Sequence, residues 1–220
     1  MYNDEIKMKA FLEAMERKDY KDIGEFKKEY ERILKEMDDT ILYKNKQIFV
    51  VNGHPRAGKD TFAKILNCVT SVCKYSSIEC IKNMAMVCGW DGTKDEKSRK
   101  FLSDLKMLTT EFNDYSFRSI KKHVEMFRNC DDYEIMLIDI REPKEIQRAV
   151  DELGAKAIFI DNPRVEHISS NIADANVDNY SYDYYLSNDG TIEDFKICIR
   201  HWYSAIKEEE NDRIKLSSLL

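Results

Sequence analysis

A short apolar run followed by a glycine-bounded loop and an amphipathic helix constrains the fold of this chain most strongly. Residues 47–52 (QIFVVN) are apolar and β-branched, which is typical of a strand buried on both faces. The loop begins at Gly53, and Gly58 precedes a helical pattern that extends from Lys59 to about Val72. A buried strand that leads through a tight loop into a helix predicts an α/β domain.

The alternation of strands and helices continues along the chain. Strands are predicted at 134–140, 155–160 and 182–186, and helices at 80–89, 94–129, 143–153 and from Thr191 to about Glu209. Pro143 stands at a first-turn position, and Gly154 follows the last residue of the same helix. Residues 161–181 show no clear period and are rich in Asn, Asp and Ser, which predicts a loop. The whole pattern indicates a mainly parallel sheet.

The first part of the chain has a different pattern. In residues 1–44, apolar side chains recur at spacings near three and four between many charges, with a break near residues 19–22. This predicts a helical extension that packs on its own domain or faces a partner chain. We expect the extension at 1–44, an α/β domain at 45–210 and a C-terminal tail at 211–220.

Composition excludes several classes of protein. With 43% hydrophobic and 35% charged residues, the chain can form a core and is not globally disordered. Its 35 Lys and Arg against 41 Asp and Glu, without a recognition motif, argue against a nucleic-acid partner. No run approaches the roughly 18 apolar residues of a membrane span. The six cysteines form no CxxC pair, so we expect reduced thiols and a cytoplasmic protein.

The loop itself has the pattern of a phosphate-binding loop. Its residues are Gly53, His54, Pro55, Arg56, Ala57, Gly58, Lys59, Asp60 and Thr61, which fit GxxxxGK between a strand and a helix. Glycines let successive N–H groups point at phosphate oxygens, and the helix adds its positive end. Lys59 can reach the β and γ phosphates, so all nine residues are predicted to bind nucleotide. Asp60 stands where a hydroxyl usually contacts Mg²⁺, and either Asp60 or Thr61 could be the metal ligand.

A loop ending in Gly-Lys-Asp-Thr resembles a branch of the nucleoside monophosphate kinase-like P-loop kinases. That branch includes phage-type deoxynucleoside monophosphate kinases and, more distantly, animal-type phosphomevalonate kinase. The resemblance covers about residues 46–206. It also includes IDIREP at 138–143, which looks like an Asp-x-Arg element, Lys82 at the acceptor-side helix, and the Asn-Asp-Gly-Thr turn at 188–191. It implies a three-layer P-loop kinase fold with a five-stranded sheet, and ATP and Mg²⁺ as cofactors.

The resemblance also implies roles for residues outside the loop. Asp139 would organise Mg²⁺ or the acceptor, although a helix-capping or salt-bridged Asp139 is the alternative. Arg141 and Lys82 would bind the acceptor phosphate, with an ion pair to a nearby glutamate as the alternative for Arg141. Arg164, in a lid-like segment at about 161–181, would join Lys59, Asp139 and Arg141 in catalysis, unless it is an ordinary surface arginine.

One family pattern is incomplete in this chain. Where family members often have Gly-Thr-Glu-x-x-Arg, residues 109–114 read TTEFND and lack both the Gly and the Arg.

These features predict an ATP- and Mg²⁺-dependent phosphotransferase. Its acceptor would be a small phosphorylated molecule, in first place a nucleoside or deoxynucleoside monophosphate. The alternatives are a kinase for a non-nucleotide phosphorylated metabolite, and a non-catalytic nucleotide-sensing module that signals through residues 1–44. We expect no nucleic-acid or membrane partner, and a monomer or a homodimer.

Overall fold

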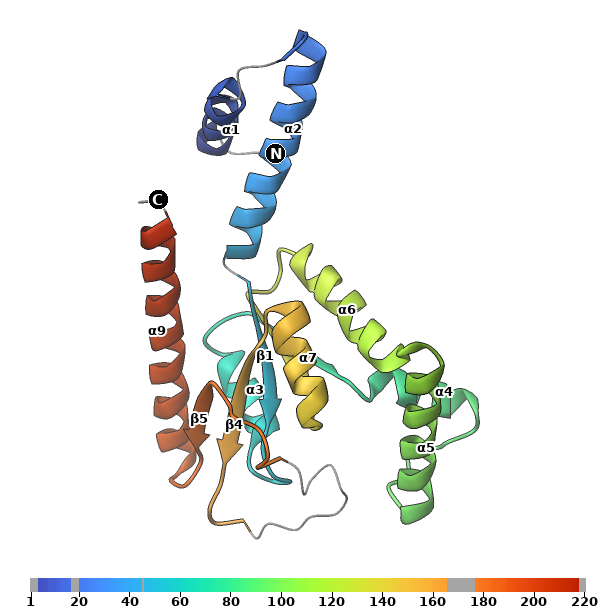
Figure 1. Ribbon diagram of the computed structural model, residues 1–220. Helices are drawn as coiled ribbons and strands as arrows, with labels where there is room; N and C mark the ends of the chain where they lie inside the picture. Colours follow the sequence, from blue (N-terminus) through green and yellow to red (C-terminus); the bar gives the residue numbers. More distant parts are fainter. Residues whose placement is uncertain (1–3, 17–19, 45, 166–176, 218–220) are drawn as a thin grey trace. The chain divides into compact units, whose positions relative to one another are not determined.

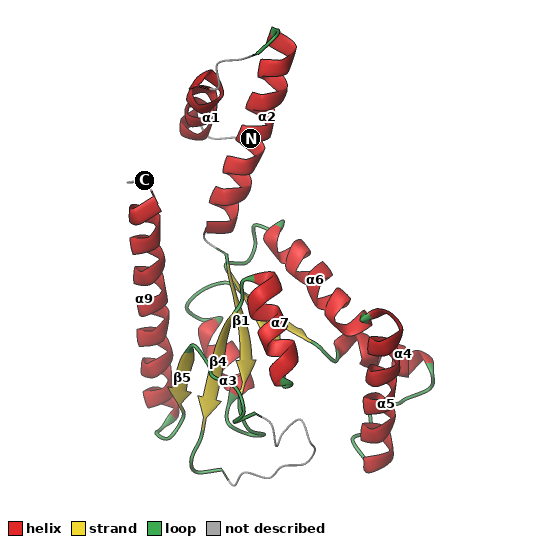
Figure 2. Cartoon of the chain, in the orientation of Figure 1, coloured by secondary structure: helices red, strands yellow, loops and turns green. Residues whose placement is uncertain are grey.

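The structure, a computed structural model, describes residues 4–16, 20–44, 46–165 and 177–217, and it divides into two units after Lys46. The first unit contains α1 (Asp4–Glu16) and α2 (Ile23–Lys44), as expected for a helical extension (Figure 2). These two helices pack on each other through a small cluster of buried side chains, namely Ala10, Ala14, Ile33 and Leu34. The lid-like segment predicted at 161–181 lies partly outside the described residues.

The second unit is built on a five-stranded sheet. Its strands are β1 (Gln47–Asn52), β2 (Val72–Ser76), β3 (Ile135–Asp139), β4 (Lys156–Asp161) and β5 (Tyr184–Ser187). They are ordered β2-β3-β1-β4-β5, and every neighbouring pair is parallel. Because β1 and β3 are parallel neighbours, their carboxyl ends lie at the same edge of the sheet, where Val51 pairs with Asp139. Ligands bind at this edge of open α/β sheets.

Helices cover both faces of the sheet, which confirms the predicted three-layer α/β class. The helices are α3 (Lys59–Leu66), α4 (Glu79–Val87), α5 (Glu96–Asn113), α6 (Tyr115–Arg128), α7 (Pro143–Leu153) and α9 (Ile192–Ser217). Helices α6 and α7 pack on one face, where α7 lies in front of β1 in Figure 1, and α3 and α9 pack on the other. The alternation along β1 explains this, because Val50 joins one core and Phe49 joins the other.

Three boundaries differ from the sequence prediction. The helix from Lys59 ends at Leu66 rather than near Val72, because Val72 starts β2 and donates its N–H to the Asn67 side chain at 3.1 Å. The long helix predicted at 94–129 is two helices, separated at Asp114, whose φ is +55°. The last helix extends to Ser217 rather than ending near residue 209.

Two expectations from composition can be compared with the structure. All six cysteines lie in described segments, and they form no disulfide. Within residues 4–16, 20–44, 46–165 and 177–217, no helix has the length and apolar character needed to span a membrane.

Candidate functional site

The 53–61 loop has the conformation that its glycines suggested. Gly53 and Gly58 have φ values of +139° and +110°, and Arg56 between them has +66°. A Cβ atom on Gly53 would lie 2.2 Å from the backbone oxygen of Ile160, and one on Gly58 would lie 2.5 Å from Nδ2 of Asn188. Only glycine fits both positions, since a side chain would be strained and would collide. The loop therefore curls tightly between β1 and α3.

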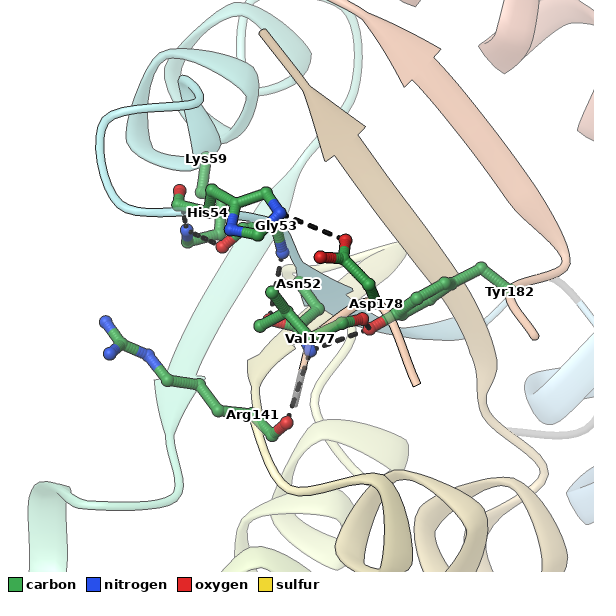
Figure 3. Close-up of polar contacts among 8 residues, drawn as sticks. All are labelled: Asn52, Gly53, His54, Lys59, Arg141, Val177, Asp178 and Tyr182. Carbon is green, nitrogen blue, oxygen red and sulfur yellow. Dashed lines mark hydrogen bonds and ion pairs between the residues drawn. The ribbon is translucent and has the colours of Figure 1, made fainter. Parts of the chain in front are cut away.

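Lys59 holds its ammonium group beside the first turn of this loop. Its Nζ donates to the carbonyl oxygen of Gly53 and, at 2.8 Å, to that of His54 (Figure 3). The side chain is half-buried, and these two contacts hold its charge at the end of β1, next to the N-terminus of α3. A phosphate at this helix end would meet both the backbone N–H groups and the lysine charge.

A buried network ties residues 177–182 to the start of the loop. Asn52 is fully buried; its Oδ1 accepts from Gly53 N at 2.9 Å, and its Nδ2 donates to the Tyr182 hydroxyl at 2.8 Å. The Tyr182 hydroxyl in turn donates to the Val177 carbonyl at 2.7 Å (Figure 3). Burial raises the pKa of Tyr182 far above its usual value, which keeps this donor protonated. In addition, His54 Nε2 lies 3.0 Å from Oδ1 of Asp178.

A second set of contacts supports the other end of the loop. The Asn188 side chain donates to the Ala57 carbonyl at 3.0 Å, and its backbone N–H donates to the Asp161 carbonyl at 2.7 Å. Arg164 donates from Nη2 to the Asn188 carbonyl at 3.0 Å. The predicted lid arginine, Arg164, therefore reaches the loop indirectly, through its contact with Asn188.

Asp60 and Asp139 share a basic partner that the sequence reasoning missed. Lys74, on β2, places its Nζ 2.6 Å from Asp60 Oδ1 and 3.0 Å from Asp139 Oδ2. Burial raises the pKa of Asp139, whereas the hydrogen bond from Lys74 lowers the pKa of the more exposed Asp60. Asp139 is therefore salt-bridged, which was the alternative considered for it. A lysine within a predicted strand would have marked Lys74 as a candidate site residue, but residues 72–76 were not predicted as a strand.

The two carboxylates suit a Mg²⁺ ion whose remaining oxygen ligands come from a substrate. Within the described segments, no three His, Cys, Asp or Glu side chains gather as a metal cluster. Mg²⁺, however, is usually held by one or two carboxylates together with substrate phosphates. The buried Oδ1 of Asp139 has no hydrogen-bond partner among the described residues, so it is available as a metal ligand. Of the two candidate metal ligands on α3, Asp60 shares its contact with Lys74 with Asp139. Thr61, the next residue, is half-buried.

The predicted acceptor residues, Arg141 and Lys82, have different local contacts. Arg141 follows β3 and accepts from Asn52 Nδ2 through its backbone oxygen at 3.4 Å, while its guanidinium extends away from this network (Figure 3). Glu145, one possible ion-pair partner of Arg141, binds Lys106 at 2.8 Å. Lys82 on α4 lies 3.5 Å from Glu79, one turn earlier on the same helix.

Comparison with known proteins gave similarities to solved structures at low sequence identity. No family model matches the chain, and no curated protein matches it. One solved structure, a dephospho-CoA kinase from Campylobacter jejuni, has a TM-score of 0.42 and 18% identity over 74% of this chain and 98% of that one. Another, TT1252 from Thermus thermophilus, has a TM-score of 0.45 and 14% identity over 74% of this chain and 97% of its own. The resemblance to phage-type deoxynucleoside monophosphate kinases stays a prediction.

Proposed function

We propose that this protein transfers a phosphoryl group from ATP to a small phosphorylated acceptor of the nucleoside or deoxynucleoside monophosphate class. The observation that carries the proposal is the conformation of the 53–61 loop. It joins the central strand to a helix, takes positive φ at Gly53 and Gly58, and holds the Lys59 ammonium at its first turn. These are the features that a triphosphate-binding loop needs.

Each charged group has a role in this proposal. Lys59 and the backbone N–H groups of the loop hold the β and γ phosphates. Asp60 and Asp139 hold Mg²⁺, which when bound neutralises charge on the phosphate oxygens. Because phosphoryl transfer depends mainly on positioning and electrostatics, no covalent intermediate with the protein is needed.

The acceptor side is assigned to three basic residues. Arg141 follows β3, so it leaves the sheet at the edge where the loop lies, and its planar fork suits a phosphate. Lys82 on α4 adds a second positive charge for the acceptor. Arg164 is positioned by Asn188, which also contacts the loop, and it stabilises the transferring group. The choice of a nucleoside monophosphate rests on the Gly-Lys-Asp-Thr resemblance.

The test is acceptor-dependent formation of ADP. The purified protein is incubated with Mg-ATP and a panel of the common ribo- and deoxynucleoside monophosphates, phosphomevalonate and dephospho-coenzyme A. We expect one class of nucleoside monophosphate to stimulate ADP formation. The Lys59→Ala protein should lose about 100-fold or more of this rate, which is typical when an electrostatic group at the reacting phosphate is removed.

Arg141→Ala separates acceptor binding from ATP binding. We expect it to leave ATP affinity unchanged and to raise the KM for the acceptor. Stimulation by phosphomevalonate or dephospho-coenzyme A alone would replace the proposed acceptor class. ATP binding without any stimulated turnover would contradict the enzyme and favour a nucleotide-sensing module.

A further inference from the structure

Lys74 lies where three elements of the second unit converge. It stands in the middle of β2, paired in register with Leu137 on β3, so Asp139 lies two residues further along the neighbouring strand and on the same face. Asp60 approaches this face from the first turn of α3. The ammonium of Lys74 therefore bridges a strand and a helix through two short ion pairs, at 2.6 and 3.0 Å.

Burial makes this bridge different from an ordinary surface ion pair. The side chains of Lys74 and Asp139 are 33% and 29% exposed, whereas that of Asp60 is 85% exposed. A buried carboxylate is costly unless a cation compensates it, and Lys74 supplies that cation for Asp139. The charges of Lys59 and Lys64 also lower the pKa of Asp60, but less than Lys74 does. The protein thus carries its own counter-ion at the carboxylate pair.

This counter-ion opposes a metal at the carboxylate pair. A divalent cation held by Asp60 and Asp139 would lie beside an ammonium that is already within 2.6 and 3.0 Å of one oxygen of each carboxylate, and would be repelled by it. The two carboxylates alone also provide only part of the six oxygens that Mg²⁺ prefers, so water would have to supply the rest. A nucleoside triphosphate changes both conditions, because its phosphates supply further oxygen ligands for the metal and a new anionic partner for the lysine. The flexible four-carbon stem of Lys74 allows its ammonium to exchange partners.

We propose that Lys74 keeps the Asp60–Asp139 pair closed to free divalent cations, so that this site takes its metal only together with a nucleoside triphosphate. The inference rests on the proposed function, which assigns the two carboxylates to the metal. It makes Lys74 a positioning residue and makes the ligand of the site the metal–nucleotide complex rather than the free ion.

The test is the binding of Mn²⁺ without nucleotide, followed through the electron paramagnetic resonance signal of the free ion. We expect no saturable binding to the wild-type protein. Lys74→Met should gain one saturable Mn²⁺ site. Its affinity should be at least about tenfold higher than the residual binding of the wild type, because a repelling charge next to the site has been removed. Lys74→Arg, which keeps the charge, should behave like the wild type. The double variant Lys74→Met/Asp139→Asn should lose the gained site.

Lys64→Met is the matched control, since Lys64 lies one turn along α3 from Asp60 and its loss removes one positive charge. We expect it to bind Mn²⁺ as weakly as the wild type. Saturable Mn²⁺ binding to the wild-type protein would overturn the inference without any variant, so the test does not depend on Lys74→Met folding. Equal binding by Lys74→Met and Lys64→Met would also overturn it.

A second titration separates this inference from the proposed function. Mn²⁺ binding is repeated with a non-hydrolysable ATP analogue, and binding of the analogue itself is followed with a fluorescent derivative. We expect the difference between the wild type and Lys74→Met to shrink when the analogue is bound, and a difference of unchanged size would contradict the exchange of partners. Failure of the protein to bind any nucleotide would remove the proposed function, while the nucleotide-free Mn²⁺ result would still decide whether Lys74 closes the pair.

Discussion

At the scale of single residues, the two glycines of the 53–61 loop differ from the other glycines that have a positive φ, because only at these two would a Cβ atom collide with its surroundings. A Cβ on Gly53 would meet a backbone oxygen of β4, which cannot move without disturbing the sheet. Gly89 also has a positive φ, of +92°, but no atom lies within 4 Å of its position for a Cβ. A comparison of Gly53 with Gly89 therefore separates the effect of a collision from the effect of backbone strain.

Gly53→Ala should lower the free energy of unfolding by more than about 3 kcal/mol, since it combines a collision with strain. Gly89→Ala carries the strain alone and should cost about 1 kcal/mol. Chemical denaturation of the two variants measures both values. Equal losses would show that the close approach of Gly53 to β4 does not constrain the loop.

The Tyr182 hydroxyl is a second residue-scale feature, because two buried groups depend on it. Tyr182→Phe would remove the acceptor for Asn52 Nδ2 and the donor to Val177. We expect a loss of about 1 to 3 kcal/mol, the usual cost of leaving buried polar groups unpaired. Tyr133→Phe, at a more exposed position, is the control and should change stability little. Thermal unfolding of both proteins measures the difference, and equal melting temperatures would contradict this account.

At the scale of elements, Glu134 connects the start of β3 to α9. Its Oε2 accepts from the Thr70 hydroxyl at 2.8 Å and from the Tyr203 hydroxyl at 3.3 Å, and it lies 3.3 Å from Lys207 Nζ. The hydrogen bond from Thr70, followed by the charge of Lys207, lowers the pKa of Glu134.

The lowered pKa of Glu134 predicts how stability depends on pH. A carboxylate whose pKa is lower in the folded state stabilises above its unfolded pKa of about 4.3, and this contribution is lost as the pH falls through the folded value. Glu134→Gln should therefore reduce the free energy of unfolding by up to about 1 kcal/mol at neutral pH, since the group is half-exposed. The difference from wild type should shrink as the pH falls below about 4.3 and through the folded pKa. Glu125→Gln, at an exposed position on α6, is the control for the loss of a carboxylate as such.

At the scale of the whole molecule, the two units have cores of different size. The sheet unit has a hydrophobic cluster on each face of the sheet, and each includes many fully buried side chains. In the unit before Gln47, the cluster seen among the described side chains has four buried apolar members. The 53–61 loop and all the residues assigned to the site lie in the sheet unit.

A fragment that begins at Gln47 should therefore fold and bind ATP with a Kd within about threefold of that of the full chain, because its core is complete. Residues 1–46 alone should show little helix, since a short helical pair with a small core is marginal in water. Circular dichroism and nucleotide titration of both fragments measure these outcomes. Loss of ATP binding by the longer fragment would show that the helical unit is part of the site.

Local signals in the sequence were sufficient for much of the sheet unit. The run at 47–52, the glycines of the loop, and the Pro143 and Gly154 that bound α7 each act within a few residues, so the sequence alone predicts them. The α/β class followed from their alternation. The placement of Lys59 beside the loop also follows from this local order, because strand, loop and helix are continuous.

The tertiary structure decided which distant side chains meet. Residues 72–76 contain a lysine and a serine and become a strand by pairing with β3, so neither β2 nor the bridge from Lys74 to Asp60 and Asp139 could be read from local pattern. Asn52 and Tyr182 are 130 residues apart, yet they share a buried hydrogen bond. Periodicity and capping report the conformation of neighbouring residues, whereas strand order and register determine which charges and polar groups come within bonding distance.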